Sequence, residues 1–261
     1  MIKVLRARWR QKYRTVAFPE GQPTLPDRFR GRPEINSAAC VKGCQACVEA
    51  CPTAAIKVGG KGVELDLGRC LFCLDCEPVC PAGAIRFTRE YRMGVAARED
   101  LALGDETRAL GRAFNARAQK LFGRSLKLRQ VSAGGCSACE ADVNVLNTVV
   151  FDLGRFGIQF VASPRHADGL LITGPVTRNM QAALEATYGA VPSPRLVIAV
   201  GACAIAGGPF ADHPEVTNGA SATVPVDLFI PGCPPHPVTI LDGLLRLLGR
   251  IEEAGDAWKK L

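Results

Sequence analysis

The sequence lacks the long apolar run that a transmembrane helix needs. Its longest candidate, Leu196 to Ala206, falls short of the roughly 18 residues of a bilayer span and contains Gly201. Residues 1–20 contain neither the apolar segment of a secretory signal nor a small-residue cleavage site. We therefore expect a protein that is soluble or peripheral to a membrane.

Signals for nucleotides and nucleic acids are also missing. Nothing matches the phosphate-binding pattern G-x-x-x-x-G-K-[ST], or G-x-G-x-x-G after a strand. The net charge of +7 is mild, and the 3 tyrosines and 2 tryptophans are not interleaved with basic residues. We expect neither a nucleotide nor a nucleic acid as a partner.

Cysteine, by contrast, is abundant. Twelve cysteines in a chain of 261 residues without a secretory signal are more typical of metal binding than of disulfides. Eight of them form an internal repeat. The second copy, Cys70 to Pro81, is the C-x2-C-x2-C-x3-C-P run of bacterial two-cluster ferredoxins. The first copy, Cys40 to Pro52, matches it with one extra residue between Cys40 and Cys44.

This spacing predicts two [4Fe-4S] clusters. Three closely spaced thiolates wrap one cluster, and the fourth cysteine, which precedes a proline, binds the other cluster. One site would consist of Cys40, Cys44, Cys47 and Cys80, and the other of Cys51, Cys70, Cys73 and Cys76. The alternative is a structural zinc-binding interaction protein, but zinc sites usually use separated C-x2-C pairs rather than triplets.

The regions outside the repeat differ in composition. Within residues 1–35, positions 1–18 alternate apolar and basic residues at helical intervals, and four prolines make positions 19–35 an extended arm. The basic amphipathic helix is expected to bind a membrane surface or an acidic partner, or else to pack on its own protein. The two-cluster domain is expected at 36–90, and a linker with a helix from Asp105 to Phe122 at 91–127.

A second domain, at 128–261 and beginning near Leu126, alternates apolar runs with helical patterns. Strands are expected at 157–162, 169–173, 195–200 and 227–230, and helices at 138–153, 176–189 and 238–253. This alternation predicts an α/β fold with a flavodoxin-like doubly wound parallel sheet, preceded by the α+β ferredoxin domain. Ligand sites in such sheets lie beyond the carboxyl ends of the strands.

The remaining four cysteines follow that rule. Cys136 and Cys139 lie in the loop that leads into the first helix, whereas Cys203 and Cys233 each follow a strand. Glycines beside them let the backbone approach a cluster. We therefore expect a third site of four thiolates. The alternative is that these cysteines are buried as small apolar side chains.

These stretches resemble a known family. Residues 126–250 are similar to the small, cluster-bearing subunit of group 4 membrane-bound [NiFe] hydrogenases, formate hydrogenlyase included, and to the homologous 20 kDa subunit of respiratory complex I. The stretches that carry the resemblance are Gly135–Glu140, Gly157–Asp168, Thr173–Val176, Gly201–Cys203 and Pro231–Pro235. Residues 36–90, with the preceding Arg28 to Pro33, resemble the two-cluster ferredoxin subunit of the same complexes. Two subunits that are usually separate are thus joined here.

The resemblance implies the electron-transfer subunit of an oxidoreductase complex, with three [4Fe-4S] clusters and no complete catalytic site. Its partners would be a NiFe-hydrogenase-like or complex I 49 kDa-like large subunit, integral membrane subunits, and a protein that donates or accepts electrons. It would lie peripherally on the cytoplasmic side of the inner membrane. Two residues separate Cys136 from Cys139. This spacing is similar to that of the hydrogenase branch, whereas the complex I subunit has adjacent cysteines in this motif. A complex I-like quinone oxidoreductase module is the alternative.

Three charged residues are candidates for tuning a cluster or coupling it to protons. Glu140 follows Cys139, where it can handle protons or complete the capping box that begins at Ser137. The resemblance places His166 close to the third cluster, where an imidazole can couple reduction to protonation. Arg165 would favour the reduced cluster by its charge. A surface histidine with neither role is the alternative for His166.

Overall fold

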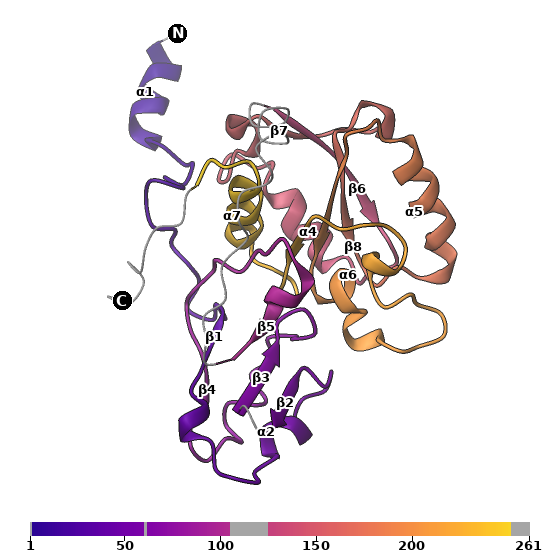
Figure 1. Cartoon of the computed structure of the whole chain (residues 1–261). Coiled ribbons are helices and arrows are strands. Elements are labelled where there is room, and N and C mark those ends of the chain that lie inside the picture. Colours follow the sequence, from indigo (N-terminus) through magenta and orange to yellow (C-terminus); the bar gives the residue numbers. More distant parts are fainter. Residues whose placement is uncertain (1, 60–61, 105–124, 252–261) are drawn as a thin grey trace.

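The computed structural model describes residues 2–59, 62–104 and 125–251, which form two lobes (Figure 1). The small lobe contains β1 (Pro33–Ile35), α2 (Ala46–Glu49), β2 (Ile56–Gly59), β3 (Gly62–Asp66), β4 (Ile85–Phe87) and β5 (Ala102–Leu103). β1 pairs with β4, and β2, β3 and β5 form a second sheet in that order, with every pairing antiparallel. Because β5 belongs to this sheet, the small lobe continues past residue 90, where the sequence analysis ends it.

The large lobe contains β6 (Leu126–Ser132), α4 (Ala138–Val145), β7 (Ile158–Phe160), β8 (Gly169–Thr173), α5 (Arg178–Ala190), β9 (Leu196–Val200), α6 (Ala202–Ala206), β10 (Leu228–Ile230) and α7 (Pro237–Leu247). Its 5-stranded sheet is parallel throughout, in the order β10-β9-β8-β6-β7. Counted along the chain from β6, this is the flavodoxin-like strand order. The predicted doubly wound α/β fold is therefore confirmed.

Short 3₁₀ helices connect these elements: η1 (Ser37–Ala39), η2 (Arg98–Leu101), η3 (Leu153–Phe156), η4 (Pro164–His166), η5 (Gly208–Phe210) and η6 (Ala220–Ala222). The four expected strands are present, but α4 ends earlier than its expected range. The Thr148 hydroxyl donates to the Val145 carbonyl at 2.7 Å, which is the acceptor that a continuing helix would offer to the Val149 N–H. Gly249, with φ +65°, ends α7 in the left-handed conformation. The helix expected from Asp105 to Phe122 lies outside the described residues.

Apolar side chains cover both faces of the large sheet. On one face, Leu171 and Ile198 pack with side chains of α4 and α7. On the other face, Ile172 and Val197 belong to a cluster that also contains Leu65 of the small lobe. The two lobes therefore share one core, and this fixes the side of the sheet against which the ferredoxin cysteines lie.

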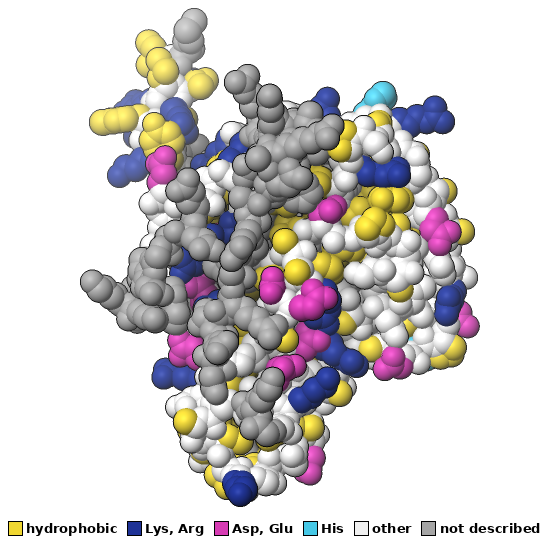
Figure 2. Space-filling model, in the orientation of Figure 1, with side chains coloured by type: hydrophobic (Ala, Val, Ile, Leu, Met, Phe, Trp, Pro, Cys, Tyr) yellow, Lys and Arg dark blue, Asp and Glu magenta, His cyan; other side chains and the backbone are white. Residues whose placement is uncertain are grey.

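Helix α1 (Ile2–Gln11) projects away from both lobes (Figures 1 and 2). Its apolar side chains are exposed, with Ile2 at 81%, Leu5 at 66% and Trp9 at 83%. The stripe expected to continue to Val16 ends sooner, because Lys12 adopts a left-handed φ of 55°. The described part of the chain thus leaves the apolar face of α1 without a covering surface. No helix in the described ranges combines the length and the apolarity needed to cross a bilayer.

A buried ion pair stabilises α7 from within. Arg246 donates from Nε to Asp242 Oδ2 at 2.8 Å, and the two residues are only 4% and 1% exposed. Burial raises the pKa of Asp242, and this effect outweighs the opposing effect of Arg246. Removing one member of such a pair leaves a buried charge without a partner.

We predict that Asp242→Ala lowers the free energy of unfolding by about 3–5 kcal/mol. Replacing both charges, by Asp242→Leu with Arg246→Met, should recover most of that loss, because buried pairs are often matched by apolar residues. Chemical denaturation of the cluster-loaded protein, followed by circular dichroism, measures both variants. A double variant as unstable as the single one would contradict this account.

Candidate cluster-binding sites

The two halves of the cysteine repeat have the same local conformation. The N–H of Ala55 donates to Cys51 Sγ at 3.2 Å, and the N–H of Ala84 donates to Cys80 Sγ at 3.2 Å. In both halves the third residue after that cysteine has a positive φ, 49° and 59°. Backbone N–H groups that point at a sulfur favour its thiolate form, which is the form that binds iron.

Several thiols of the small lobe influence the pKa of others in the same predicted group of four. Burial is the largest cause of the raised pKa of Cys47, and the charges of Cys80, Cys40 and Cys44 add to it. Burial likewise raises the pKa of Cys70 to about 12, with further contributions from Cys76, Cys51 and Cys73. The sequence grouped these cysteines in the same way, and their role as cluster ligands stays a prediction.

The third set of cysteines lies at the carboxyl edge of the large sheet. Cys136 and Cys139 follow β6, Cys203 follows β9, and Cys233 follows β10. Burial raises the pKa of Cys139, and the charges of Cys203 and Cys233 raise it further. Burial raises the pKa of Cys203 to about 11, again with a contribution from Cys233. The structure therefore brings together four thiols from three separate loops, next to the place between β6 and β8 where the strand order reverses.

Two glycines with positive φ let the backbone come close to these sulfurs. A Cβ at Gly201, where φ is +92°, would lie 2.6 Å from Cys139 Sγ. A Cβ at Gly208, where φ is +56°, would lie 2.7 Å from Cys203 Sγ. A side chain at either position would fill the space beside the thiol. Four thiols beside glycines without side chains leave room for an iron–sulfur cluster, whose irons are held by cysteine thiolates.

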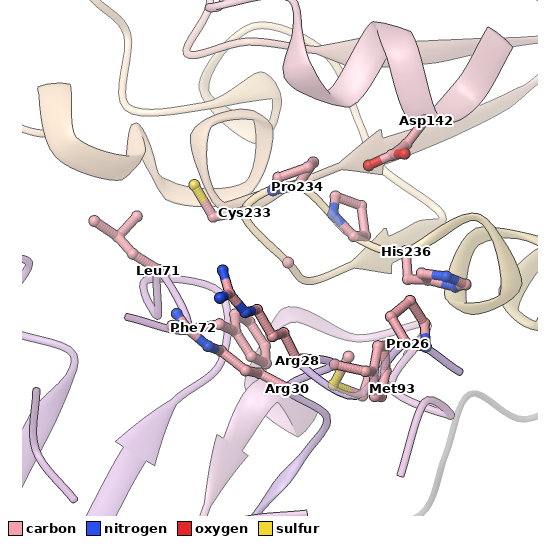
Figure 3. Close-up of a pocket in the computed structure, with 13 residues that line it drawn as sticks. Pro26, Arg28, Arg30, Leu71, Phe72, Met93, Asp142, Cys233, Pro234 and His236 are labelled. Carbon is pink, nitrogen blue, oxygen red and sulfur yellow. The ribbon is translucent and has the colours of Figure 1, made fainter. Parts of the chain in front are cut away.

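In the small lobe, we call the first group Cys40, Cys44, Cys47 and Cys80, and the middle group Cys51, Cys70, Cys73 and Cys76. The middle group lies near the third group across the junction between the lobes. The charge of Cys73 is one of the causes that raise the pKa of Cys233, after burial and the charge of Cys136. Leu71 and Phe72, from the loop that holds Cys73, line a cavity of about 330 Å³ together with Cys233 (Figure 3). The ligand loops of the two lobes are thus direct neighbours.

Glu140 does not form the expected capping box. Ser137 has a left-handed φ of 69°, and its side chain makes no capping hydrogen bond. Instead, Glu140 Oε1 accepts hydrogen bonds from Ser132 Oγ at 2.6 Å and from Thr173 Oγ1 at 2.7 Å. Burial acts to raise the pKa of Glu140, but these hydrogen bonds outweigh it and the pKa is lowered. The capping interpretation is therefore wrong, and a role in proton handling stays a prediction.

Arg165 and His166 do not lie beside the third group of cysteines. Both are exposed residues of η4, in the short connection from β7 to β8. Asp168 donates its N–H to the Lys127 carbonyl at 2.7 Å, which holds the end of this connection at the start of β6. The cysteine loop follows the opposite end of that strand. The expectation that His166 and Arg165 act next to the cluster is therefore wrong, because the connection returns the chain to the amino ends of the strands.

Sequence reasoning missed the contribution of Arg30 from the extended arm. Its guanidinium donates to the carbonyls of Phe72 at 2.7 Å and Cys73 at 3.4 Å. A cation at this loop favours the more negative, reduced state of a bound cluster. The arginine-rich stretch from Arg28 to Arg32 was the available signal, but only the folded arm shows which arginine reaches the loop.

The contacts of Glu140 give a test of the corrected interpretation. Ser132→Ala removes a hydrogen bond to a carboxylate and should lower the free energy of unfolding by about 1.5–3 kcal/mol. Ser137→Ala should change it by less than about 0.5 kcal/mol, because Ser137 does not cap the helix. Denaturant unfolding of both variants decides the point. A larger loss for Ser137→Ala than for Ser132→Ala would restore the capping box.

Comparisons with known proteins agree with this geometry. Residues 136–247 match the family described as NADH ubiquinone oxidoreductase, 20 Kd subunit, and residues 20–84 match the 4Fe-4S dicluster domain. The second match supports the prediction that the chain is an iron–sulfur protein.

Three curated relatives each match about half of this chain. The probable membrane-bound hydrogenase subunit mbhJ of Pyrococcus furiosus is 40% identical over 132 residues, which are 51% of this chain and 79% of the relative. Formate hydrogenlyase subunit 7 of Escherichia coli is 43% identical over 51% of this chain, and the match spans about half, 52%, of the relative. An NADH-quinone oxidoreductase subunit of Heliobacterium modesticaldum is 40% identical over 46% of this chain and 69% of the relative.

These matches confirm the resemblance stated from the motifs. The 20 Kd subunit match contains all four cysteines of the third group, and the dicluster match precedes it in the same polypeptide. The chain belongs to the family of the 20 Kd subunit of NADH–ubiquinone oxidoreductase, here joined to a 4Fe-4S dicluster domain.

Proposed function

We propose that this chain is the electron-transfer subunit of a membrane-bound, complex I-related hydrogenase. It relays single electrons through three [4Fe-4S] clusters to or from the NiFe site of a partner large subunit. The clusters supply the redox chemistry, and the protein sets their spacing, burial and hydrogen bonding.

The observation that carries this proposal is that thiols of successive groups lie close enough to influence one another. The charge of Cys47, in the first group, contributes to the raised pKa of Cys76 in the middle group, where burial is the largest cause. The charge of Cys73, in the middle group, contributes to the raised pKa of Cys233 in the third. Since electron transfer slows steeply with distance, closely neighbouring clusters are the arrangement that a relay requires.

The arrangement of the cysteines in the sequence favours clusters over zinc, because zinc sites usually use separated C-x2-C pairs rather than triplets. A structural zinc would need four sulfurs at about 2.3 Å from a single ion. A cubane has an iron at each of four corners, so it takes thiolates that lie further apart.

The first and third groups differ in exposure in a way that suits entry and exit. Cys136 and Cys233 of the third group are exposed, so a large subunit that covers this edge of the sheet would approach the third cluster directly. In the first group, Cys40 and Cys44 are half-buried beside Val41, which is 53% exposed. A protein that donates or accepts electrons would dock there.

A quinone-linked module of the complex I type is the second candidate. The relative from Heliobacterium modesticaldum, named as part of an NADH-quinone oxidoreductase and 40% identical, favours it. The spacing of Cys136 and Cys139 favours the hydrogenase branch. The sequence of the partner large subunit separates the two candidates, because a hydrogenase partner must carry two C-x2-C pairs to hold nickel.

Iron analysis and one substitution test the number and the assignment of the clusters. The purified protein should contain about twelve irons and twelve sulfides, and Cys233→Ser should contain about eight of each. The EPR signal of the third cluster should vanish in Cys233→Ser while both ferredoxin-lobe signals persist. Loss of all three signals would contradict separate sites, and a colourless zinc-loaded protein would end the electron-transfer proposal.

Helix α1 supports a peripheral location at the membrane, on its cytoplasmic side. Its exposed apolar side chains and its basic residues Lys3, Arg6, Arg8 and Arg10 suit the interface of an anionic bilayer. Integral membrane subunits of the complex would add to this attachment.

We expect the protein to sediment with vesicles that contain phosphatidylglycerol, and less with pure phosphatidylcholine or at high salt. Leu5→Ser should weaken binding roughly tenfold, because it removes one buried apolar side chain from the interface. Val149→Ser, at an exposed apolar residue outside α1, is the matched control. Equal binding by both variants would exclude α1 as the lipid contact and leave a protein partner as its ligand.

A further inference from the structure

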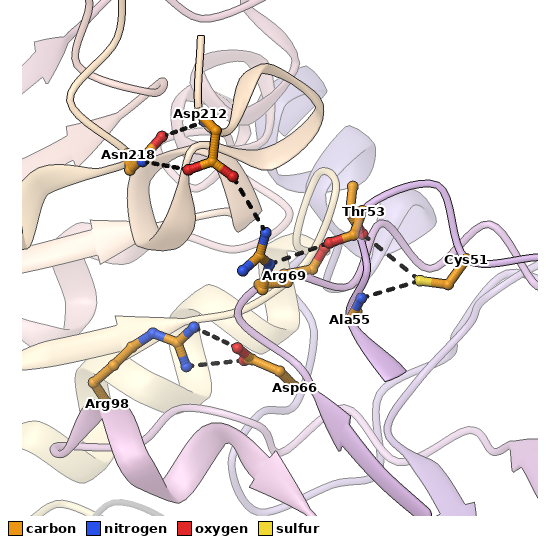
Figure 4. A network of polar contacts seen from close by, with 8 residues as sticks. All are labelled: Cys51, Thr53, Ala55, Asp66, Arg69, Arg98, Asp212 and Asn218. Carbon is orange, nitrogen blue, oxygen red and sulfur yellow. Dashed lines mark hydrogen bonds and ion pairs between the residues drawn. The ribbon is translucent and has the colours of Figure 1, made fainter. Parts of the chain in front are cut away.

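A reciprocal pair of hydrogen bonds joins the two halves of the repeat at the middle group of thiols (Figure 4). Thr53 Oγ1 donates to the Arg69 carbonyl at 2.7 Å, and Arg69 Nε donates to the Thr53 carbonyl at 3.1 Å. Thr53 lies two residues after Cys51, and Arg69 directly precedes Cys70. The pair therefore ties together the loops that carry these two thiols.

The pair of hydrogen bonds is largely buried and lies close to the thiol of Cys51. Thr53 is only 8% exposed, and its Oγ1 lies 3.9 Å from Cys51 Sγ. Without the hydroxyl, the Arg69 carbonyl loses the partner that this buried position provides. A buried polar group without a partner is costly, so the two loops would separate or rearrange.

The first group of thiols has no equivalent of this pair. By the register of the repeat, Ala82 takes the place of Thr53 after Cys80, and Ala39 takes the place of Arg69 before Cys40. Alanine side chains offer no hydrogen bond. The middle group of thiols therefore has this hydrogen-bonded pair, whereas the sequence places alanines at the equivalent positions of the first group.

Arg69 also points toward the other lobe. Its Nη2 lies 4.0 Å from Asp212 Oδ2, on the segment that follows α6 and Cys203. Asn218 holds that carboxylate by donating from Nδ2 to Asp212 Oδ1 at 2.9 Å. The Asp212 side chain is 78% exposed, so this ion pair contributes little stability, and the two bonds with Thr53 are the main restraint.

We infer that Thr53 and Arg69 are positioning residues that would hold Cys51 and Cys70 as ligands of the middle cluster and so retain its full complement of iron. The inference rests on the proposed function, in which these two cysteines bind one cubane. If a ligand loop loosens, a thiolate takes up a proton and one Fe²⁺ leaves [4Fe-4S]²⁺, which gives [3Fe-4S]⁰ without a change in electron count. Ferricyanide then removes one electron to give [3Fe-4S]⁺, which has an EPR signal that the intact oxidised cluster lacks.

The decisive variant is Thr53→Val, which keeps the shape of the side chain and removes the hydroxyl. Its clusters should release iron to a chelator roughly tenfold faster than those of the unmodified protein, as loss of a buried hydrogen bond implies. A [3Fe-4S]⁺ signal should appear after ferricyanide. Thr53→Ser keeps the hydroxyl and should restore both measurements, and Arg69→Gln should behave like Thr53→Val.

The chain offers a matched control in Thr88→Val. Thr88 Oγ1 donates to the Arg32 carbonyl, also at 2.7 Å and in the same lobe, and it accepts from the Glu90 N–H rather than from a residue of a ligand loop. This variant should match the unmodified protein in iron release. In fully reduced Thr53→Val, the magnetic coupling of the middle cluster to both of its neighbours should change, while the first and third clusters keep all their iron.

Two outcomes would overturn the inference. One is iron release from Thr53→Val that equals that from Thr88→Val. The other is equal loss of iron from all three clusters, which would report general unfolding. An unmodified protein that lacks about twelve irons would instead refute the proposed function, so the two failures are distinguishable.

Discussion

The proposed relay depends on close packing between Gly68 and Ile205. Gly68 lies two residues before Cys70, and Ile205 lies two residues after Cys203. A Cβ on Gly68 would come within 2.7 Å of Ile205 Cγ2, so a larger residue there would displace the side chains packed against it. Ile205 belongs to the core shared by the lobes. Hydrophobic burial in that core holds the middle and third groups of thiols near each other.

Burial in the same packing bears on how the proposed clusters would bind. Burial and mutual repulsion raise the pKa of Cys70 and Cys76 to about 12, with burial the larger cause in each. Iron that binds here as proposed would have to displace the thiol protons, so the affinity of these thiols for iron should depend on pH.

The sequence predicts the ligand loops and the sheet well because short local patterns determine them. The spacing of the cysteines predicts which thiols a short loop can bring together. Apolar runs such as Leu196–Val200 predict buried parallel strands. Strand β6 has no such run, because the polar residues Lys127, Arg129 and Gln130 interrupt it, and the sequence analysis did not predict it. Strand β6 lies inside the sheet because it pairs with both β7 and β8, and no local sequence pattern predicts this pairing.

Side-chain partners were predicted less well, for the same reason. Glu140 stands three residues after Ser137, as a capping box requires, but two hydroxyls from β6 and β8 bind its carboxylate instead. His166 lies within a stretch that carries the family resemblance, Gly157–Asp168, yet the direction of β6 separates it from the cysteines. Such outcomes depend on how strands far apart in the sequence pair, so spacing alone does not decide them.

The repeat shows how two similar ligand loops acquire different surroundings. Both halves place a backbone N–H on the last cysteine of the motif at 3.2 Å. Around the middle group, however, Arg30 contacts the loop of Cys73, and Arg69 contacts the loop of Cys51. The position equivalent to Arg69 in the first group is Ala39. If the proposed clusters are bound, positive charge beside the middle one would favour its reduced state relative to the first.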